Sequence, residues 1–367
     1  MLSERVRGIQ PSSTVQLTTR IAQMRAEGVR VIGLNVGEPD FPTPDHICRK
    51  AREAIEEGFT RYTTVMGIPE LRQAIADKLR LRNHVSYLPE EVTIGPGAKQ
   101  CIFAALLALC DPGDEVIIPY PCWVSYTEMV RMAGGRPVMV KTAEDGSLDP
   151  AAVEAAVTGR TKAVLINTPN NPTGAVYSGE SLEELAFLAR KYDLYILSDE
   201  VYESMVFDGE EHISISSLSE DSRKRTILIN SFSKTYAMTG WRLGYLAGDK
   251  TVIRAVNTVQ SQMISSVNSI SQKAGVAALT GSQDCVQSMT EEYDRRRQYL
   301  WDRLCGIKGI SCHKGKGAFY LLPDISFYLG RDIRGSASGT MRIFRSIFWR
   351  RQGWRSCRAA LFWHPDI

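Results

Sequence analysis

The segment TILINSFSKTYAMTGWRLGYLAG, residues 226–248, holds two apolar runs separated by a polar stretch. The runs at 226–230 and 242–248 are mostly apolar, which is typical of strands that are buried on both faces of a sheet. Between them, Lys234 is flanked by hydroxyl side chains, and Arg242 follows eight residues later. The segment therefore predicts two buried strands joined by a loop that carries charge.

Five earlier runs have the same character, at residues 92–94, 115–119, 136–140, 162–167 and 194–199. Apolar residues recur at helical spacing in the intervening segments 69–82, 99–110, 125–135 and 181–193. This alternation predicts an α/β fold with a large, mostly parallel seven-stranded sheet and helices on both of its faces.

Composition limits the class of protein. The chain has 367 residues, 44% of them hydrophobic, which is enough for a large core and for two domains. The N-terminus has no apolar signal region, and no run of about 18 apolar residues occurs, so we expect a cytoplasmic protein that does not span a membrane. Eight cysteines lack CxxC spacing, so we expect reduced thiols and no zinc site.

Positive charge is concentrated at the C-terminal end. The net charge is +3, but residues 331–367 contain eight arginines and two aspartates, so residues 1–330 are net negative. The body of the chain therefore lacks the basic surface of a nucleic-acid-binding protein. A basic tail that binds nucleic acid is one interpretation of residues 331–367.

Polar residues follow three of the predicted strands. Asn171 comes shortly after 162–167, Asp199 closes 194–199, and Lys234 follows 226–230. Alone, each has an ordinary explanation as a turn residue, a helix cap or a solvated lysine. Together they predict a ligand site, because the carboxyl ends of parallel strands meet at one edge of a sheet.

Eight motifs in this order resemble the fold-type I pyridoxal-phosphate enzymes, and within them the class I aminotransferases of the bacterial aspartate aminotransferase kind. The resemblance runs from about residue 8 to about residue 325. The motifs are NVGEPDF (35–41), RYTTVMGIPELR (61–72), GPGAKQ (95–100), DPGDEVIIPYPCWVSY (111–126), NTPNNPTGAVY (167–177), SDEVYE (198–203), SKTYAMTGWRLGY (233–245) and GAFYLLPD (317–324).

The resemblance implies pyridoxal 5'-phosphate as cofactor and assigns the catalytic residues. Lys234 would hold the cofactor as an imine, the internal aldimine, and would later act as the base that moves the substrate α-proton. Asp199 would pair with the ring nitrogen and keep it protonated. Tyr202 and Asn171 would donate hydrogen bonds to the phenolic oxygen, which lowers the proton affinity of the imine.

The resemblance also implies a phosphate site. Arg242 and Ser231 lie at the spacings from Lys234 that the family uses for the phosphate, and Ser233 is a further candidate. The backbone N–H groups of Ala98 and Lys99 begin the predicted helix, where an anion is favoured.

The remaining implied residues concern the ring, the substrate and the partner. Trp123 resembles the aromatic residue that stacks on the cofactor, and Tyr62 the residue lent across a homodimer interface to the neighbour's phosphate. Lys99 would meet an acidic side chain, which favours aspartate or glutamate with a 2-oxo acid. Gly37, Trp123 and Asn171 complete the expected substrate-binding set.

The family pattern ends near residue 330. A VVPG-like strand and a late arginine that grips the substrate α-carboxylate are missing. Read one base out of frame, FWRRQGWRSCRAALF (348–362) yields the family-like LEKAGMAVVPGSAF with suitable free bases. A frameshift between about residues 326 and 348 would explain the change and would impair turnover.

We therefore expect four regions. Residues 1–45 form an N-terminal arm and part of a small α+β domain, and 46–285 form the large cofactor-binding domain. Residues 286–330 return to the small domain, and 331–367 form a poorly ordered tail. Two alternatives share every cofactor residue named: a C–S lyase, which would not depend on a keto-acid acceptor, and a truncated cofactor-binding protein without turnover.

Overall fold

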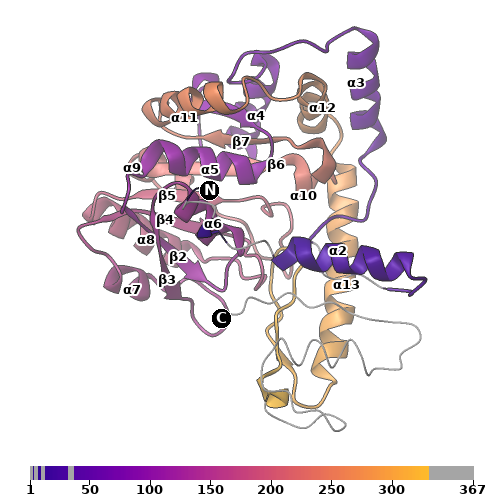
Figure 1. Cartoon of the computed structure of the whole chain (residues 1–367), viewed down its shortest axis with the longest axis vertical. Coiled ribbons are helices and arrows are strands. Elements are labelled where there is room, and N and C mark those ends of the chain that lie inside the picture. The colour runs from indigo at the N-terminus through magenta and orange to yellow at the C-terminus, as the bar shows by residue number, and fades with distance from the viewer. Residues whose placement is uncertain (1–2, 4–6, 10–12, 32–36, 330–367) are drawn as a thin grey trace.

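In the computed structural model, which describes residues 3, 7–9, 13–31 and 37–329, a seven-stranded sheet forms the centre of the chain (Figure 1). The strand order is β1-β7-β6-β5-β4-β2-β3. The strands are β1 (Val92–Gly95), β2 (Glu115–Tyr120), β3 (Arg136–Lys141), β4 (Thr161–Asn167), β5 (Tyr195–Asp199), β6 (Thr226–Ser231) and β7 (Gly244–Ala247). Each predicted strand is present, and the mostly parallel α/β sheet is confirmed; β7 runs antiparallel to β1 and β6.

The helices connect and cover the strands (Figure 1). Those up to β4 are α2 (Ser13–Ala26), α3 (Asp45–Glu56), α4 (Pro69–Arg82), α5 (Ala98–Leu109), α6 (Ser125–Met132) and α7 (Pro150–Ala155). Those after β4 are α8 (Gly179–Lys191), α9 (Glu220–Arg225), α10 (Phe232–Thr235), α11 (Lys250–Met263), α12 (Ser269–Thr280) and α13 (Asp284–Cys305). Four 3-10 turns are η1 (Pro89–Glu91), η2 (Ile215–Ser217), η3 (Thr239–Trp241) and η4 (Ser326–Tyr328).

Alternate residues along each central strand enter different cores. In β2, Val116 and Ile118 pack with α5, α6 and α11, whereas Ile117 faces α7 and α8 on the other side. In β7, Tyr245 and Ala247 join a third core with α3, α4 and α12. Both faces are therefore apolar, which explains why the strands are continuous apolar runs rather than alternating ones.

A second, smaller unit of structure follows the sheet. The 22-residue helix α13 leads to a two-stranded antiparallel pair, β8 (Ser311–Cys312) with β9 (Pro323–Asp324). No helix in the described part of the chain is long and apolar enough to cross a membrane. The expected domain boundaries stay predictions, and the proposed frameshift region from residue 330 onward lies outside the described residues, as does the tail.

Candidate active site

Asp199 ends β5 and is buried at the carboxyl edge of the sheet. The Tyr126 hydroxyl, from α6, donates a 2.6 Å hydrogen bond to Asp199 Oδ2, and the Val201 N–H donates to Oδ1 at 3.3 Å. Desolvation raises the pKa of Asp199 to about 6, although both hydrogen bonds oppose the rise. A carboxylate held in this way favours a cationic partner.

Lys234 lies in the short helix α10, directly after β6. The Ser231 hydroxyl caps this helix by accepting a 3.4 Å hydrogen bond from the Ser233 N–H. Lys234 Nζ donates to the carbonyl oxygen of Gly37 at 2.5 Å. Burial lowers the pKa of Lys234 to about 8, with Arg242 acting in the same direction, so a large fraction of the amine is neutral in weakly alkaline solution. The lysine is thus suited to act as a nucleophile and a base.

Arg242 lies beside the N-terminus of α5. Its guanidinium donates to the Thr239 carbonyl at 2.8 Å and to the Pro96 carbonyl at 3.2 Å. A Cβ at Gly97 would lie 2.4 Å from Arg242 Nη2, and one at Gly244 would lie 2.8 Å from the Ala98 nitrogen. The two glycines therefore allow the cation and the first N–H of the helix to come together, which is an arrangement that binds anions.

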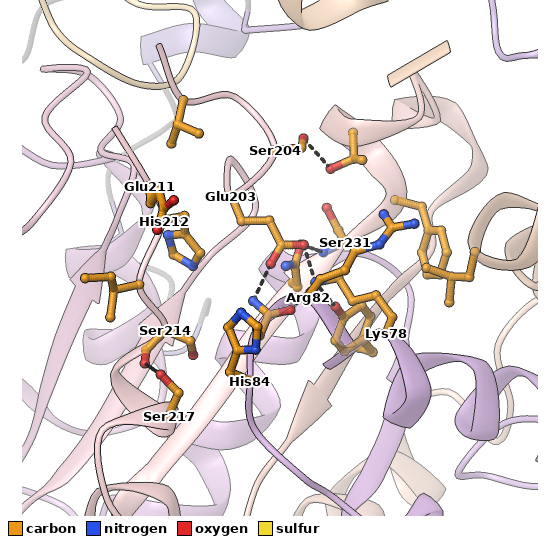
Figure 2. A pocket seen from close by; sticks show the side chains of 18 of the residues that line it. Lys78, Arg82, His84, Glu203, Ser204, Glu211, His212, Ser214, Ser217 and Ser231 are labelled. Atoms are coloured by element: carbon orange, nitrogen blue, oxygen red, sulfur yellow. Dashed lines mark hydrogen bonds and ion pairs between the residues drawn. The ribbon is translucent and has the colours of Figure 1, made fainter. Parts of the chain in front are cut away.

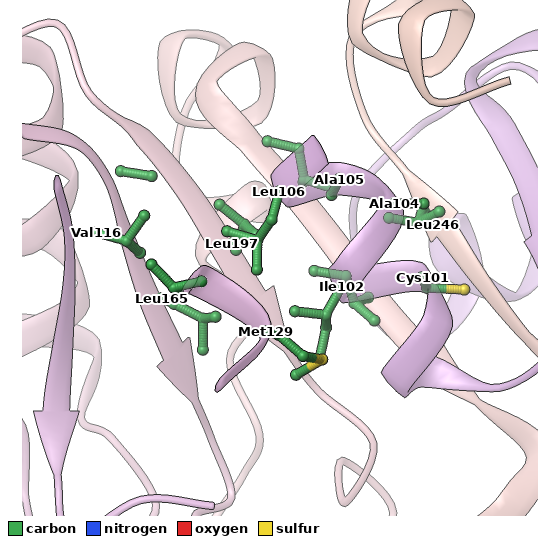
Figure 3. Close-up of a cluster of buried hydrophobic side chains, with 14 of the residues drawn as sticks. Cys101, Ile102, Ala104, Ala105, Leu106, Val116, Met129, Leu165, Leu197 and Leu246 are labelled. Atoms are coloured by element: carbon green, nitrogen blue, oxygen red, sulfur yellow. The ribbon is translucent and has the colours of Figure 1, made fainter. Parts of the chain in front are cut away.

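The apolar packing of α5 fixes where that N-terminus lies. Ile102 and Leu106 of the helix point toward Leu197 of β5 and belong to one buried cluster with Met129 of α6 (Figure 3). Close packing of this kind leaves little freedom for the helix to shift. The N-terminal end of α5 is therefore held in place by the sheet beneath it.

Tyr202 and Asn171 both contact the hydroxyl of Tyr320. The hydroxyl oxygens of Tyr202 and Tyr320 are 2.7 Å apart, and Asn171 Nδ2 donates to Tyr320 at 3.3 Å. Burial raises the pKa of both tyrosines, so both keep their protons. Tyr320 lies in the GAFYLLPD motif, but it was not among the residues predicted for the site.

Asn167 joins two of the predicted residues through their backbones. Its Nδ2 donates to the Asp199 carbonyl at 2.9 Å, and its Oδ1 accepts from the Asn171 N–H at 2.7 Å. Like Tyr320, Tyr126 and Asn167 were not predicted as site residues from the sequence. Asn167 could have been found, because it is the last residue of the strand before Asn171.

Trp123 lies beside these groups. Its ring meets Tyr126 edge to face with centroids 5.4 Å apart, and Lys99 Nζ lies 4.9 Å from the Trp123 ring centroid. Burial lowers the pKa of Lys99, and Arg242 lowers it further. Tyr62 differs from the other predicted residues: it is 89% exposed and is not packed into the site of its own chain.

A polar cavity of about 420 Å³ opens next to Ser231 (Figure 2). On its wall Lys78 pairs with Glu203, and each also bonds Asn83 at 2.8 Å. Glu200, Glu203 and His212 come close enough to resemble a metal site. However, Glu200 already accepts from two serines and from His212, and Glu203 is neutralised by Lys78. We interpret the cluster as an ion-pair network that supports the wall behind Lys234.

The structure thus gathers eleven of the twelve predicted site residues and leaves Tyr62 outside. Those gathered are Gly37, Ala98, Lys99, Trp123, Asn171, Asp199, Tyr202, Ser231, Ser233, Lys234 and Arg242. The segment in which the family pattern would place its late arginine lies outside the described residues.

Comparison with known proteins identifies the family. The model of the family "Aminotransferase class I and II" matches residues 29–338. An aspartate aminotransferase of Bacillus sp. (strain YM-2) is 42% identical over 89% of this chain and 84% of its own length. An aspartate/prephenate aminotransferase of Nitrosomonas europaea is 44% identical over 90% of this chain and 84% of its own length.

Solved structures agree. The aspartate aminotransferase of Thermus thermophilus with maleate superposes with a TM-score of 0.87 at 44% identity, covering 92% of this chain and 88% of its own. The enzyme from Rhizobium meliloti gives a TM-score of 0.91 at 39% identity, covering 96% and 89%. The chain therefore belongs to the class I and II aminotransferases, which use pyridoxal phosphate to move an amino group between amino and keto acids.

Proposed function

We propose that this aminotransferase moves the amino group of aspartate or glutamate to a 2-oxo acid, with Lys234 as its catalytic base. The observation that carries the proposal is that a partly buried lysine of lowered pKa and a buried carboxylate of raised pKa lie at one edge of the sheet. Groups whose surroundings push their pKa values toward neutrality are characteristic of catalytic sites. No observation favours the C–S lyase or the inactive protein over transamination.

The site fits pyridoxal phosphate group by group. The cofactor has a phosphate, a basic ring nitrogen, a phenolic oxygen and an aldehyde. Arg242 and the Ala98 N–H suit the phosphate, Asp199 suits the protonated nitrogen, and Lys234 suits the aldehyde. The buried position of Asp199, which has no cationic side chain among its hydrogen-bond partners, makes this fit specific.

When bound, the cofactor supplies an electron sink that makes the substrate α-proton acidic. Lys234 Nζ would take that proton and return it to the carbon of the cofactor's aldehyde group. A neutral amine is available for this because the pKa of Lys234 is lowered to about 8. Asp199 would hold its charge against the ring nitrogen, oriented by Tyr126. Ser231 and Ser233 would add donors at the phosphate, and Trp123 would cover the ring.

Substrate choice would depend on Lys99. Its Nζ is held over Trp123, within the group of residues that surround Lys234. An ammonium there would attract a second carboxylate, and similar proteins are named for aspartate. Lys99→Met should raise KM for aspartate more than tenfold and leave KM for alanine nearly unchanged.

We also propose a homodimer in which Tyr62 completes the partner's site. A tyrosine that is 89% exposed has a large amphipathic surface to bury at an interface. Mixing Tyr62→Ala with Lys234→Ala chains tests this. Exchange should create some sites with both native residues and recover about a quarter of the native activity, whereas no recovery would contradict the shared site. We place the protein in the cytoplasm, where free thiols persist.

A coupled assay tests the function itself. The purified chain, loaded with pyridoxal phosphate, is given aspartate with and without 2-oxoglutarate. We expect oxaloacetate and glutamate in equal amounts and only with the acceptor present. A parallel assay with a cysteine thioether and no acceptor tests the lyase: release of a thiol, ammonia and pyruvate would favour it. No turnover of either substrate by a loaded protein would favour the inactive alternative.

A further inference from the structure

We propose that Tyr320 is a positioning residue that sets the direction of the Tyr202 proton. The structure brings Tyr320 to the two side chains that the proposed function assigns to the phenolic oxygen of the cofactor. The inference deepens that proposed function and rests on it.

Three segments meet at this point. Tyr320 lies between β8 and β9, Asn171 follows β4 and Tyr202 follows β5, so the contact joins the small unit to the edge of the sheet. The Tyr202 and Tyr320 rings pack edge to face at 5.6 Å, and Phe319 packs against both. The packing of the Tyr320 ring against Tyr202 and Phe319 therefore fixes the position of the Tyr320 hydroxyl.

The hydrogen atoms set the direction of the chain of bonds. Asn171 Nδ2 is only a donor, so the Tyr320 oxygen accepts at 3.3 Å. Either hydroxyl can donate across the 2.7 Å contact between Tyr320 and Tyr202. When Tyr202 gives its single proton to the phenolic oxygen of the cofactor, as proposed, Tyr320 must be the donor and Tyr202 the acceptor. This leaves the Tyr202 proton directed away from Tyr320 and available to a further acceptor. A hydroxyl that accepts a hydrogen bond is also a stronger donor.

Gly37 extends the arrangement to the lysine. A Cβ on Gly37 would lie 1.8 Å from the Tyr320 hydroxyl oxygen, so the tyrosine packs directly against this glycine. The Gly37 carbonyl accepts from Lys234 Nζ. Tyr320 thus lies between the residues assigned to the phenolic oxygen and the loop that holds the catalytic amine.

Tyr320→Phe tests the inference because it removes the hydroxyl and keeps the ring. With Tyr202 less well oriented, the donor to the phenolic oxygen weakens. In the loaded protein we expect the pH midpoint of the visible absorption change to rise by about half a unit to one unit. We also expect the dissociation constant for pyridoxal phosphate to increase severalfold, measured by fluorescence on the cofactor-free protein.

Tyr293→Phe is the matched control. The Tyr293 ring packs on Phe319 in the same aromatic cluster, and its buried hydroxyl has no hydrogen-bond partner among the described residues. In the loaded Tyr293→Phe variant, the visible absorption change should have the same pH midpoint as in the native protein. In a Tyr202→Phe background, Tyr320→Phe should add almost no further shift, because Tyr320 acts through Tyr202.

The outcomes are distinguishable. If the native chain gives no visible band with pyridoxal phosphate, the proposed function fails first. If the native band is present but Tyr320→Phe titrates like Tyr293→Phe, the inference is wrong. A full-size shift from Tyr320→Phe in the Tyr202→Phe background would also overturn it, since Tyr320 would then act without Tyr202.

Discussion

The Tyr126 hydroxyl donates a 2.6 Å hydrogen bond to the buried carboxylate of Asp199, and the two residues come from different elements, α6 and β5. This bond favours the charged form of Asp199 against the desolvation that raises its pKa to about 6. Under the proposed function, the charge that Asp199 would offer to the ring nitrogen is therefore maintained by a tyrosine that itself stays protonated.

Tyr126→Phe should make cofactor binding more sensitive to acid. Without the hydrogen bond the pKa of Asp199 rises further above 6, so Asp199 is neutral over more of the acidic range. The pH at which affinity for pyridoxal phosphate falls to half should move up by about one unit. Fluorescence titrations from pH 5 to pH 8.5 measure this, and an unmoved midpoint would contradict the role of Tyr126.

Asp199→Asn should stabilise the cofactor-free protein at neutral pH while costing most of the turnover. A folded-state pKa raised from 3.8 to about 6 means that the folded state binds the extra proton. The stability from Asp199 is thus fully present below pH 4 and is lost as the pH rises through 6. At pH 8 the variant should gain about 1–3 kcal/mol in unfolding free energy, with no gain at pH 4.

Urea unfolding at the two pH values measures this difference. Equal unfolding free energies of the two proteins at pH 8 would show that the buried charge of Asp199 does not destabilise the fold. The kcat of the loaded variant should fall by about 100-fold or more, because it cannot supply the negative charge at the ring nitrogen.

Gly37→Ala should disturb the site although its backbone needs no positive φ. The new Cβ would lie 1.8 Å from the Tyr320 hydroxyl oxygen, so Tyr320 must move away from Tyr202 and Asn171. We expect kcat/KM to fall at least tenfold. Gly159→Ala, where no atom lies within 4 Å of the new Cβ, is the control. Equal activity of both variants would show that the loop adjusts freely.

Lys78→Met should destabilise the fold by about 3–5 kcal/mol, because it leaves the Glu203 carboxylate buried without its cation. The exposed pair of Lys50 and Glu53 provides the control, and Lys50→Met should cost far less, because solvent screens the exposed charges. Replacing both Lys78 and Glu203 by apolar residues should recover much of the loss. Similar costs for the two single variants, measured in urea, would contradict the buried network.

The sheet could be predicted from sequence because each central strand is buried on both faces. That burial makes strand segments such as 163–166 continuously apolar, and polar residues follow where the strands end. The antiparallel direction of β7 could not be predicted, since its apolar pattern is the same in either direction. It depends on the pairing of Gly244 with Ser231 and Gly95 across the sheet.

The predicted site lacked two tyrosines, Tyr126 and Tyr320, that form hydrogen bonds with its predicted residues. Tyr126 reaches Asp199 across 73 positions of sequence, and Tyr320 reaches Asn171 across 149. Neither tyrosine differs in sequence from a core aromatic residue, so only the fold shows which hydroxyl it meets. Tyr62 was identified from the family motif alone, and its proposed role requires a second chain.

One measurement tests the proposed role of Lys234 most directly. The chain is loaded with pyridoxal phosphate, reduced with borohydride, digested and analysed by mass spectrometry. We predict loss of the visible band and a cofactor adduct on the peptide that contains Lys234, with none in the Lys234→Ala variant. An adduct of equal yield on another lysine, or one that survives in Lys234→Ala, would contradict the assignment of the site.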